Sequence, residues 1–142
     1  MKSPGSVEER LVVVLADDQG KSEVIHLLRA WRERLEPVRF VATRDTGNLI
    51  RSRLGLDVEL VESGGWGGAC QLAALVVTGV AEAAIVLCEP SLHAEQNIAT
   101  VALHRVCDIH NVPFASNRAT ADAVLGWLVG NPNEGTVVEA CT

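Results

Sequence analysis

Five short apolar segments, separated by stretches with apolar residues at helical spacing, restrict the fold of this chain more than any other feature. The apolar segments are residues 11–16, 38–42, 58–61, 83–88 and 112–115, and the helical patterns cover residues 21–35, 46–54, 69–78, 96–111 and 119–129. Several of the short segments are apolar throughout, which is typical of parallel strands buried on both faces. Strands that alternate with helices predict an α/β protein, a three-layer sandwich around a mainly parallel five-stranded sheet.

The length of 142 residues suits one domain of this kind. We expect residues 1–9 to be a disordered lead-in, residues 10–130 to form the domain and residues 131–142 to be a short C-terminal tail. The net charge is −6 and Lys and Arg form no run, which argues against a nucleic-acid partner. No apolar stretch reaches the roughly 20 uncharged residues of a membrane span. The polar opening is unlike a signal peptide, so we expect a cytoplasmic protein.

The cysteines give no sign of a metal or redox site. Cys70, Cys88, Cys107 and Cys141 form no C-x-x-C pair. Their positions in apolar or helical stretches favour inert, buried thiols, which suit a reducing compartment. We therefore expect neither a metal nor a cofactor.

Polar residues gather just after the predicted strands, in residues 17–21, 43–46, 63–68, 89 onward and 116–118. In a parallel sheet these strand ends share one edge, where ligands of α/β proteins bind. The second loop is the most informative, because a strand there leads through a Thr- and Gly-containing turn into a helix. Such a turn presents backbone N–H groups and hydroxyls to an anion, most often a phosphate.

Five stretches of the chain carry a more specific signal. They read V-L-A-D-D with Lys21 nearby, A-T-R-D-T-G-N-L-I, S-G-G-W-G-G-A-C-Q, E-P at positions 89–90, and N-V-P followed by N-R-A-T-A-D. In order and spacing they resemble the methylglyoxal synthase family over roughly residues 10–128. The resemblance implies the fold of that family, a reaction that converts dihydroxyacetone phosphate to methylglyoxal and phosphate, and a homo-oligomer, by resemblance a hexamer. The same fold also serves as a regulatory domain, so it does not fix the function.

The resemblance fails at the residues that would carry the chemistry. Ala69 occupies the position of the family's catalytic Asp, and Ala cannot remove a proton. Asp17 and Gln96 stand where the family has histidines. Asp18 matches a family carboxylate, and Glu89 replaces an Asp. These two are the remaining candidates for a catalytic base, which a reaction of this type requires close to the proton that it removes.

The phosphate-binding part is better preserved. The ligand-binding candidates are Asp17, Lys21, Thr43, Arg44, Asp45, Thr46, Ser63, Gly64, Trp66 and Gln96. Arg44 and Asp45 stand where the family usually has Gly-Thr, and they either pair with each other or change the ligand. Trp66, in a glycine-rich loop, either covers the ligand or stacks on a ring, or it packs on a neighbouring helix or subunit.

Three hypotheses about function stay open. The favoured one is a methylglyoxal synthase-like protein that has lost its base and binds a small ligand, such as a phosphorylated metabolite, in a binding or regulatory role. The second is an active or weakly active methylglyoxal synthase, or a related lyase, that uses another carboxylate. The third is a non-catalytic subunit that assembles with an active paralogue.

Overall fold

A computed structural model describes residues 9–88 and 98–130 of the chain. In chain order the elements are β1 (Arg10–Ala16), α1 (Gly20–Trp31), η1 (Arg32–Arg34), β2 (Val38–Thr43), α2 (Arg44–Leu54), β3 (Val58–Val61), η2 (Gly64–Trp66), α3 (Gly68–Val77), β4 (Ala83–Leu87), α4 (Ile98–Ile109), β5 (Phe114–Ala115) and α5 (Arg118–Val129). All five predicted strands and all five predicted helices are present. The expected lead-in and C-terminal tail lie outside the described residues, apart from residue 9.

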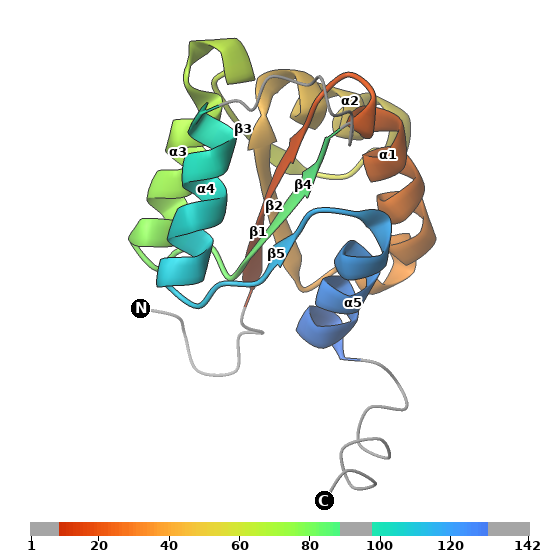
Figure 1. Ribbon diagram of the computed structural model, residues 1–142. Coiled ribbons are helices and arrows are strands. Elements are labelled where there is room, and N and C mark those ends of the chain that lie inside the picture. Colours follow the sequence, from red (N-terminus) through yellow and green to blue (C-terminus); the bar gives the residue numbers. More distant parts are fainter. Residues whose placement is uncertain (1–8, 89–97, 131–142) are drawn as a thin grey trace, which may run out of the picture.

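The five strands form one parallel sheet in the order β3-β2-β1-β4-β5. The chain therefore builds outward from β1 to one edge, and then crosses back to add β4 and β5 on the other side. Figure 1 shows the sheet edge-on between its helices. The prediction of a three-layer α/β fold with a parallel five-stranded sheet is confirmed.

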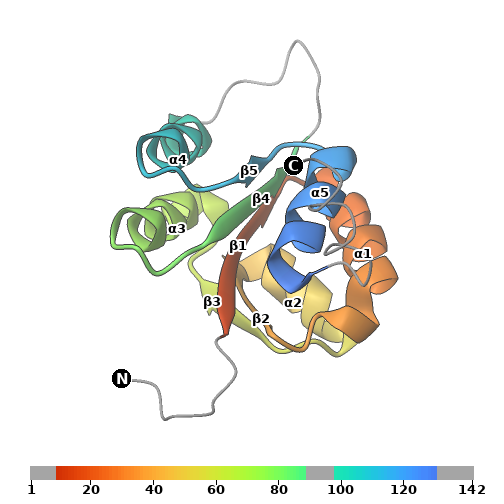
Figure 2. The ribbon, with the colours of Figure 1, turned by 90° about the horizontal axis from the view of Figure 1, so that it is seen from below.

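Two helical layers cover the sheet, with α1, α2 and α5 on one face and α3 and α4 on the other (Figure 2). The side chains of β1 alternate between them. Val12 and Val14 join the cluster beneath α1, α2 and α5, whereas Val13 and Leu15 join the cluster beneath α3 and α4. Because both faces of β1 are covered, all its central residues must be apolar.

Several element boundaries differ from the sequence-based prediction. Helix α2 begins at Arg44, two residues earlier than expected, and α1 ends at Trp31 and continues as a 3-10 turn. Strand β5 contains only Phe114 and Ala115. It follows Pro113, which has no N–H to donate but accepts a hydrogen bond from the Ala84 N–H through its carbonyl group.

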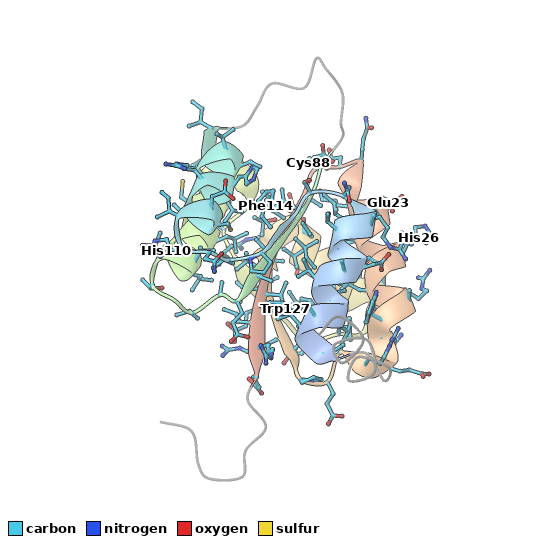
Figure 3. The ribbon with its side chains drawn as sticks, turned by 60° about the horizontal axis from the view of Figure 1, so that its bottom comes forward. Glu23, His26, Cys88, His110, Phe114 and Trp127 are labelled. Carbon is cyan, nitrogen blue, oxygen red and sulfur yellow. The ribbon has the colours of Figure 1, made fainter. Side chains whose placement is uncertain are left out.

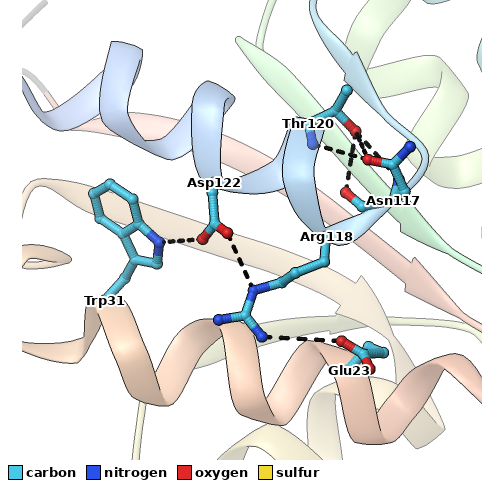
Figure 4. A network of polar contacts seen from close by, with 6 residues as sticks. All are labelled: Glu23, Trp31, Asn117, Arg118, Thr120 and Asp122. Carbon is cyan, nitrogen blue, oxygen red and sulfur yellow. Dashed lines mark hydrogen bonds and ion pairs between the residues drawn. The ribbon is translucent and has the colours of Figure 1, made fainter.

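The N-R-A-T-A-D motif holds α5 in place (Figure 4). Asn117 caps the helix by accepting a hydrogen bond from the Thr120 N–H at 2.9 Å, and the Thr120 hydroxyl pairs with the Asn117 N–H in return. Asp122 accepts a hydrogen bond from the indole N–H of Trp31 and also pairs with Arg118. The part of the motif that follows Asn117 therefore fastens α5 to α1.

None of the helices in the described part of the chain is long and apolar enough to cross a membrane.

Candidate functional site

Where the structure describes them, the loops singled out from the sequence meet at one edge of the sheet. Because the four strands β1 to β4 are parallel and adjacent, the segments that follow them leave the sheet on the same side. These segments carry Asp17, Arg44, Ser63 and Cys88 (Figure 1). Glu89 and Gln96, two further candidates, lie outside the described residues.

The turn between β1 and α1 brings a carboxylate to the start of that helix. Asp17 Oδ1 accepts a hydrogen bond from the Gly20 N–H at 2.6 Å. A Cβ atom at Gly20 would lie 1.7 Å from the carbonyl oxygen of Leu87, so only glycine lets α1 begin this close to the end of β4. The start of α1 is thus held against the neighbouring strand, and one of its N–H groups already has an anionic partner.

Lys21 and Asp18 form an ion pair beside this turn. The Lys21 ammonium group lies 2.7 Å from Asp18 Oδ1, with the Asp18 side chain 97% exposed and the Lys21 side chain 20% exposed. The hydrogen bond from Lys21, together with its charge, holds the pKa of Asp18 below its ordinary value. A carboxylate with a lowered pKa in open solvent is a weak general base.

The turn between β2 and α2 begins a helix that has no side-chain cap. Thr43 is the N-cap residue of α2 in an extended conformation, and no side chain makes a capping hydrogen bond there. Thr43 and Thr46 are buried, with their hydroxyl oxygens 3.3 Å apart, and the Thr46 hydroxyl lies 3.4 Å from the carbonyl oxygen of Ala16. Uncapped N–H groups beside buried hydroxyls favour an anionic ligand.

Arg44 and Asp45 do not pair with each other. The Arg44 guanidinium instead pairs with the Glu62 carboxylate, which follows β3, while Asp45 is exposed in the first turn of α2. Both partners of the Arg44–Glu62 pair are about half exposed, so the pair contributes little stability. The pair joins the start of α2 to the end of β3. The Glu62 carboxylate also offsets the positive charge of Arg44 at this edge of the sheet.

The loop between β3 and α3 is folded tightly around Ser63. The Ser63 carbonyl oxygen accepts hydrogen bonds from the N–H groups of Trp66 and Gly68, both at 3.0 Å. Gly67 has φ +89°, and a Cβ atom at Gly68 would lie 1.9 Å from the carbonyl oxygen of Glu62. This loop therefore depends on glycine for its close approach to β3. The Trp66 side chain is 82% exposed and so does not pack into the described core.

Ala69 lies in the first turn of α3, directly after this loop, and is 1% exposed. Its methyl group belongs to the apolar cluster beneath α3 and α4. A carboxylate at this position would be desolvated, which raises its pKa and strengthens it as a base. The residue that is present carries no group that can accept a proton.

Cys88, at the end of β4, is a neighbour of Asp17 that the sequence analysis did not include among the site residues. Burial raises the pKa of the Cys88 thiol, and the backbone N–H of Asp17 offsets part of that effect by donating to the sulfur atom. This contact depends on β4 lying beside β1, which spacing along the sequence does not reveal. Figure 3 labels Cys88 at the end of its strand.

Other features of the described residues lie away from these loops. A hollow of about 300 Å³ at the opposite edge of the sheet is lined by residues that include Arg10, Glu82, His110 and Trp127. Figure 3 labels two of them, His110 and Trp127. Within residues 9–88 and 98–130, no group of three or more His, Cys, Asp or Glu side chains could hold a metal ion.

No family model matches the chain. Individual relatives and a solved structure nevertheless point to one family. The chain is 34% identical over 130 residues to a methylglyoxal synthase of Ralstonia nicotianae, covering 89% of this chain and 96% of that protein. It is 39% identical over 117 residues to a methylglyoxal synthase of Burkholderia thailandensis, covering 82% and 90%. A crystal structure of methylglyoxal synthase from Elizabethkingia anophelis matches with a TM-score of 0.77 and 28% identity over 89% of this chain and 81% of that one.

Proposed function

The chain belongs to the methylglyoxal synthase family, and we propose that it binds a small phosphorylated metabolite at the carboxyl edge of its sheet without the family's usual catalytic base. Its role in this proposal is binding or regulation. The observation that carries the proposal is Ala69, a buried methyl group at the position where the family resemblance implies a carboxylate.

The binding part of the proposal rests on the start of α2. Its N–H groups have no capping side chain, and the hydroxyls of Thr43 and Thr46 lie next to them. A phosphate group takes several such donors at once and is favoured by the partial positive charge at a helix start. Lys21 and the turn that begins at Ser63 complete the proposed cradle. Such a site distinguishes a phosphorylated ligand from its uncharged analogue.

The non-catalytic part of the proposal rests on the lack of a well-placed base among the described residues. General base catalysis contributes about 10²–10⁴-fold to a rate, so its loss alone would leave a very slow enzyme. Asp18 faces solvent and pairs with Lys21, and Asp17 already accepts a hydrogen bond from the Gly20 N–H. Neither carboxylate is placed in the desolvated position that Ala69 occupies.

Two alternative functions remain. A methylglyoxal synthase or related lyase that uses another carboxylate would rely on Glu89 or Asp18. A non-catalytic subunit that assembles with an active paralogue would retain the fold and the binding edge of the sheet, but no catalytic activity of its own. The proposal also includes a homo-oligomer, with six copies as the expected number, and a cytoplasmic location.

An activity assay with a matched pair of variants tests the proposal. Methylglyoxal formation from dihydroxyacetone phosphate is measured for the wild type, for Ala69→Asp and for Ala69→Asn, each corrected for the spontaneous reaction. We expect no activity from the wild type or from Ala69→Asn, which has the size of Asp but no base, and a measurable rate from Ala69→Asp. A wild-type rate equal to that of the Ralstonia relative would refute the loss of the base.

A thermal-shift measurement tests binding independently of catalysis. Inorganic phosphate and phosphoglycolate should raise the melting temperature of the wild type, since a ligand at 100 times its Kd stabilises a protein by about 2.7 kcal/mol. Glycolate, which lacks the phosphate, should have a much smaller effect. Thr46→Val, which keeps the shape and removes the hydroxyl, should weaken the phosphate response. Equal responses to phosphoglycolate and glycolate would contradict a phosphate cradle.

A further inference from the structure

The amino-edge hollow, lined by residues that include Arg10, Glu82, His110 and Trp127, is a second place where a small molecule fits. Its volume of about 300 Å³ lies at the lower end of the range for small-molecule sites. It reaches from one helical layer to the other, because His110 directly follows α4 and Trp127 lies in the last turn of α5 (Figure 3). Strand β1 is 7 residues long, so about 20 Å separate this hollow from the proposed phosphate cradle.

A loose ion pair between Arg10 and Glu82 lies in this hollow. The sheet fixes both backbones, since the Glu82 N–H donates to the Leu11 carbonyl oxygen at 2.8 Å and the Arg10 N–H donates to that of Pro37 at 2.9 Å. Between the side chains, however, Arg10 Nη1 and Glu82 Oε2 are 3.6 Å apart, which is too far for a hydrogen bond. Glu82 Oε2 is buried and has no hydrogen-bond partner among the described residues. A covered carboxylate oxygen without a donor is unusual and calls for an explanation.

Both members of the pair have hydrogen-bonding capacity left for a ligand. The guanidinium group carries five N–H donors, and the terminal torsion of a Glu side chain turns easily, so the half-exposed Glu82 carboxylate can face a donor in the hollow. Because the charges of Arg10 and Glu82 balance, an uncharged ligand suits them best. The nearby carboxyl ends of α3, α4 and α5 carry partial negative charge, which disfavours a phosphate here.

The other walls of the hollow suit a flat ring. The Trp127 side chain is 56% exposed, although Trp is a large apolar residue. Val112 and Pro113, which precede β5, also line the hollow and are partly exposed. An accessible indole ring beside apolar walls favours a planar partner that stacks on it. The hollow therefore combines a stacking surface with one donor group next to one acceptor group.

We propose that the amino-edge hollow binds the guanine base of a nucleoside, a function beyond the one proposed for the carboxyl edge. One edge of guanine presents a carbonyl acceptor followed by two N–H donors. Arg10 donates to the carbonyl oxygen, the Glu82 carboxylate accepts from both N–H groups, and the ring stacks on Trp127. Adenine presents a donor followed by an acceptor along the same edge, so its ring nitrogen lone pair would face the carboxylate. Uracil has a single N–H between two carbonyl groups.

Equilibrium dialysis with labelled guanosine tests this site. Guanosine has no phosphate, so its binding does not depend on the proposed cradle, and either proposal can fail without the other. We expect a Kd of about 100 µM or tighter, from the usual affinity per atom of a ligand of this size. Adenosine and inosine, which lacks the second donor, should bind about tenfold more weakly or worse, because hydrogen bonds to a charged group are strong. Phosphoglycolate should not displace guanosine.

Matched variants assign the binding to the hollow. Glu82→Gln should weaken guanosine binding about tenfold, since it removes the charge of the acceptor. Glu59→Gln is its control, because it breaks another half-exposed Arg–Glu pair, with Arg39, at the same edge of the sheet but outside this hollow. Trp127→Ala should weaken binding about tenfold or more, and Trp127→Phe, which restores a ring, should recover most of it. Circular dichroism controls for folding, and Arg10→Gln is a further variant if Glu82→Gln does not fold.

Four results would overturn the proposal. The first is that the wild type retains no guanosine, which would leave the hollow to water. The second is equal binding of adenosine and guanosine, because the row of donors and acceptors would then not be recognised. The third is unchanged binding in the folded Glu82→Gln or Arg10→Gln variant. The fourth is displacement of guanosine by phosphoglycolate, which would place the nucleoside at the carboxyl edge instead.

Discussion

The ammonium group of Lys21 lies 2.7 Å from Oδ1 of Asp18, so the cation that could reach a bound phosphate already has a carboxylate partner. The Asp18 side chain is almost fully exposed, whereas that of Lys21 is mostly covered. The ion pair therefore sits at the rim of the candidate cradle, with its negative end toward solvent. A phosphate that binds Lys21 must compete with Asp18 for the same N–H donors.

The first prediction follows from this competition. Asp18→Asn should raise the affinity for phosphoglycolate by about two- to fivefold, because exposed ion pairs are weak and Asn competes less well for Lys21. Isothermal titration calorimetry measures the change. Asp57→Asn, an equal change of charge at the amino end of β3, serves as the control and should leave the affinity unchanged. A lower affinity in Asp18→Asn would mean that Asp18 itself contacts the ligand.

The loop that begins at Ser63 gives the second prediction. Gly68→Ala would place a Cβ atom 1.9 Å from the backbone carbonyl oxygen of Glu62, so the loop would have to move. We expect a destabilisation of about 1–3 kcal/mol, as for other overpacked sites, together with weaker phosphate binding. Gly64→Ala is the control in the same loop, because a Cβ atom there would meet nothing within 4 Å. Equal midpoints of urea unfolding for the two variants would contradict this prediction, because the loop would then accommodate the added Cβ atom without loss of stability.

The fold could be predicted from the sequence because its signals are local. Strand β1 is apolar at each position from 11 to 16, and α1 repeats Val24, Leu27 and Leu28 at helical spacing. Such periodicity depends on neighbours within a few residues, so it predicts the existence and type of each element. The polar loops that follow the strands then located the candidate site at the carboxyl edge of the sheet.

The contacts within the site could not be predicted in the same way. Arg44 pairs with Glu62 rather than with its sequence neighbour Asp45, because β2 and β3 are adjacent and bring their ends together. Cys88 meets Asp17 for the same reason, across β1 and β4. These pairs are separated by 18 and 71 residues, so they depend on the order of strands in the sheet. A single sequence does not contain that order as a local pattern.

The cysteines give the third prediction, an order of reactivity. The expectation of buried thiols is correct for Cys107 but wrong for Cys70 and Cys88, which are exposed. Burial raises the pKa of Cys107 to about 11 and also raises that of Cys88. Because the thiolate is the reactive form, iodoacetamide at pH 8 should alkylate Cys70 first, Cys88 more slowly and Cys107 only after unfolding. Mass spectrometry of peptides from a Cys141→Ser background identifies the modified sites.

The raised pKa of Cys107 also gives a direction for the pH dependence of stability. Above pH 9.0, the ordinary pKa of a cysteine thiol, the unfolded chain loses a proton that the folded chain keeps until about pH 11. The free energy of unfolding should therefore fall as the pH rises through this window. Cys107→Ala, although less stable at every pH because of the lost side-chain volume, should show a smaller fall. An equal fall in both proteins would assign the effect to other groups.

The last prediction concerns the contact between Trp31 and Asp122, which joins α1 to α5 (Figure 4). The indole N–H donates to Asp122 Oδ1 at 2.8 Å in a partly buried position, and Arg34 lies over the Trp31 ring at 4.1 Å. Trp31→Phe and Asp122→Ala should each destabilise the protein. In urea unfolding, the double mutant should reveal a coupling energy of about 1 kcal/mol, the usual contribution of one hydrogen bond. Trp31→Phe combined with Asp108→Ala, on the opposite helical layer, should show none. A coupling energy near zero for Trp31 and Asp122 would mean that packing alone joins the two helices.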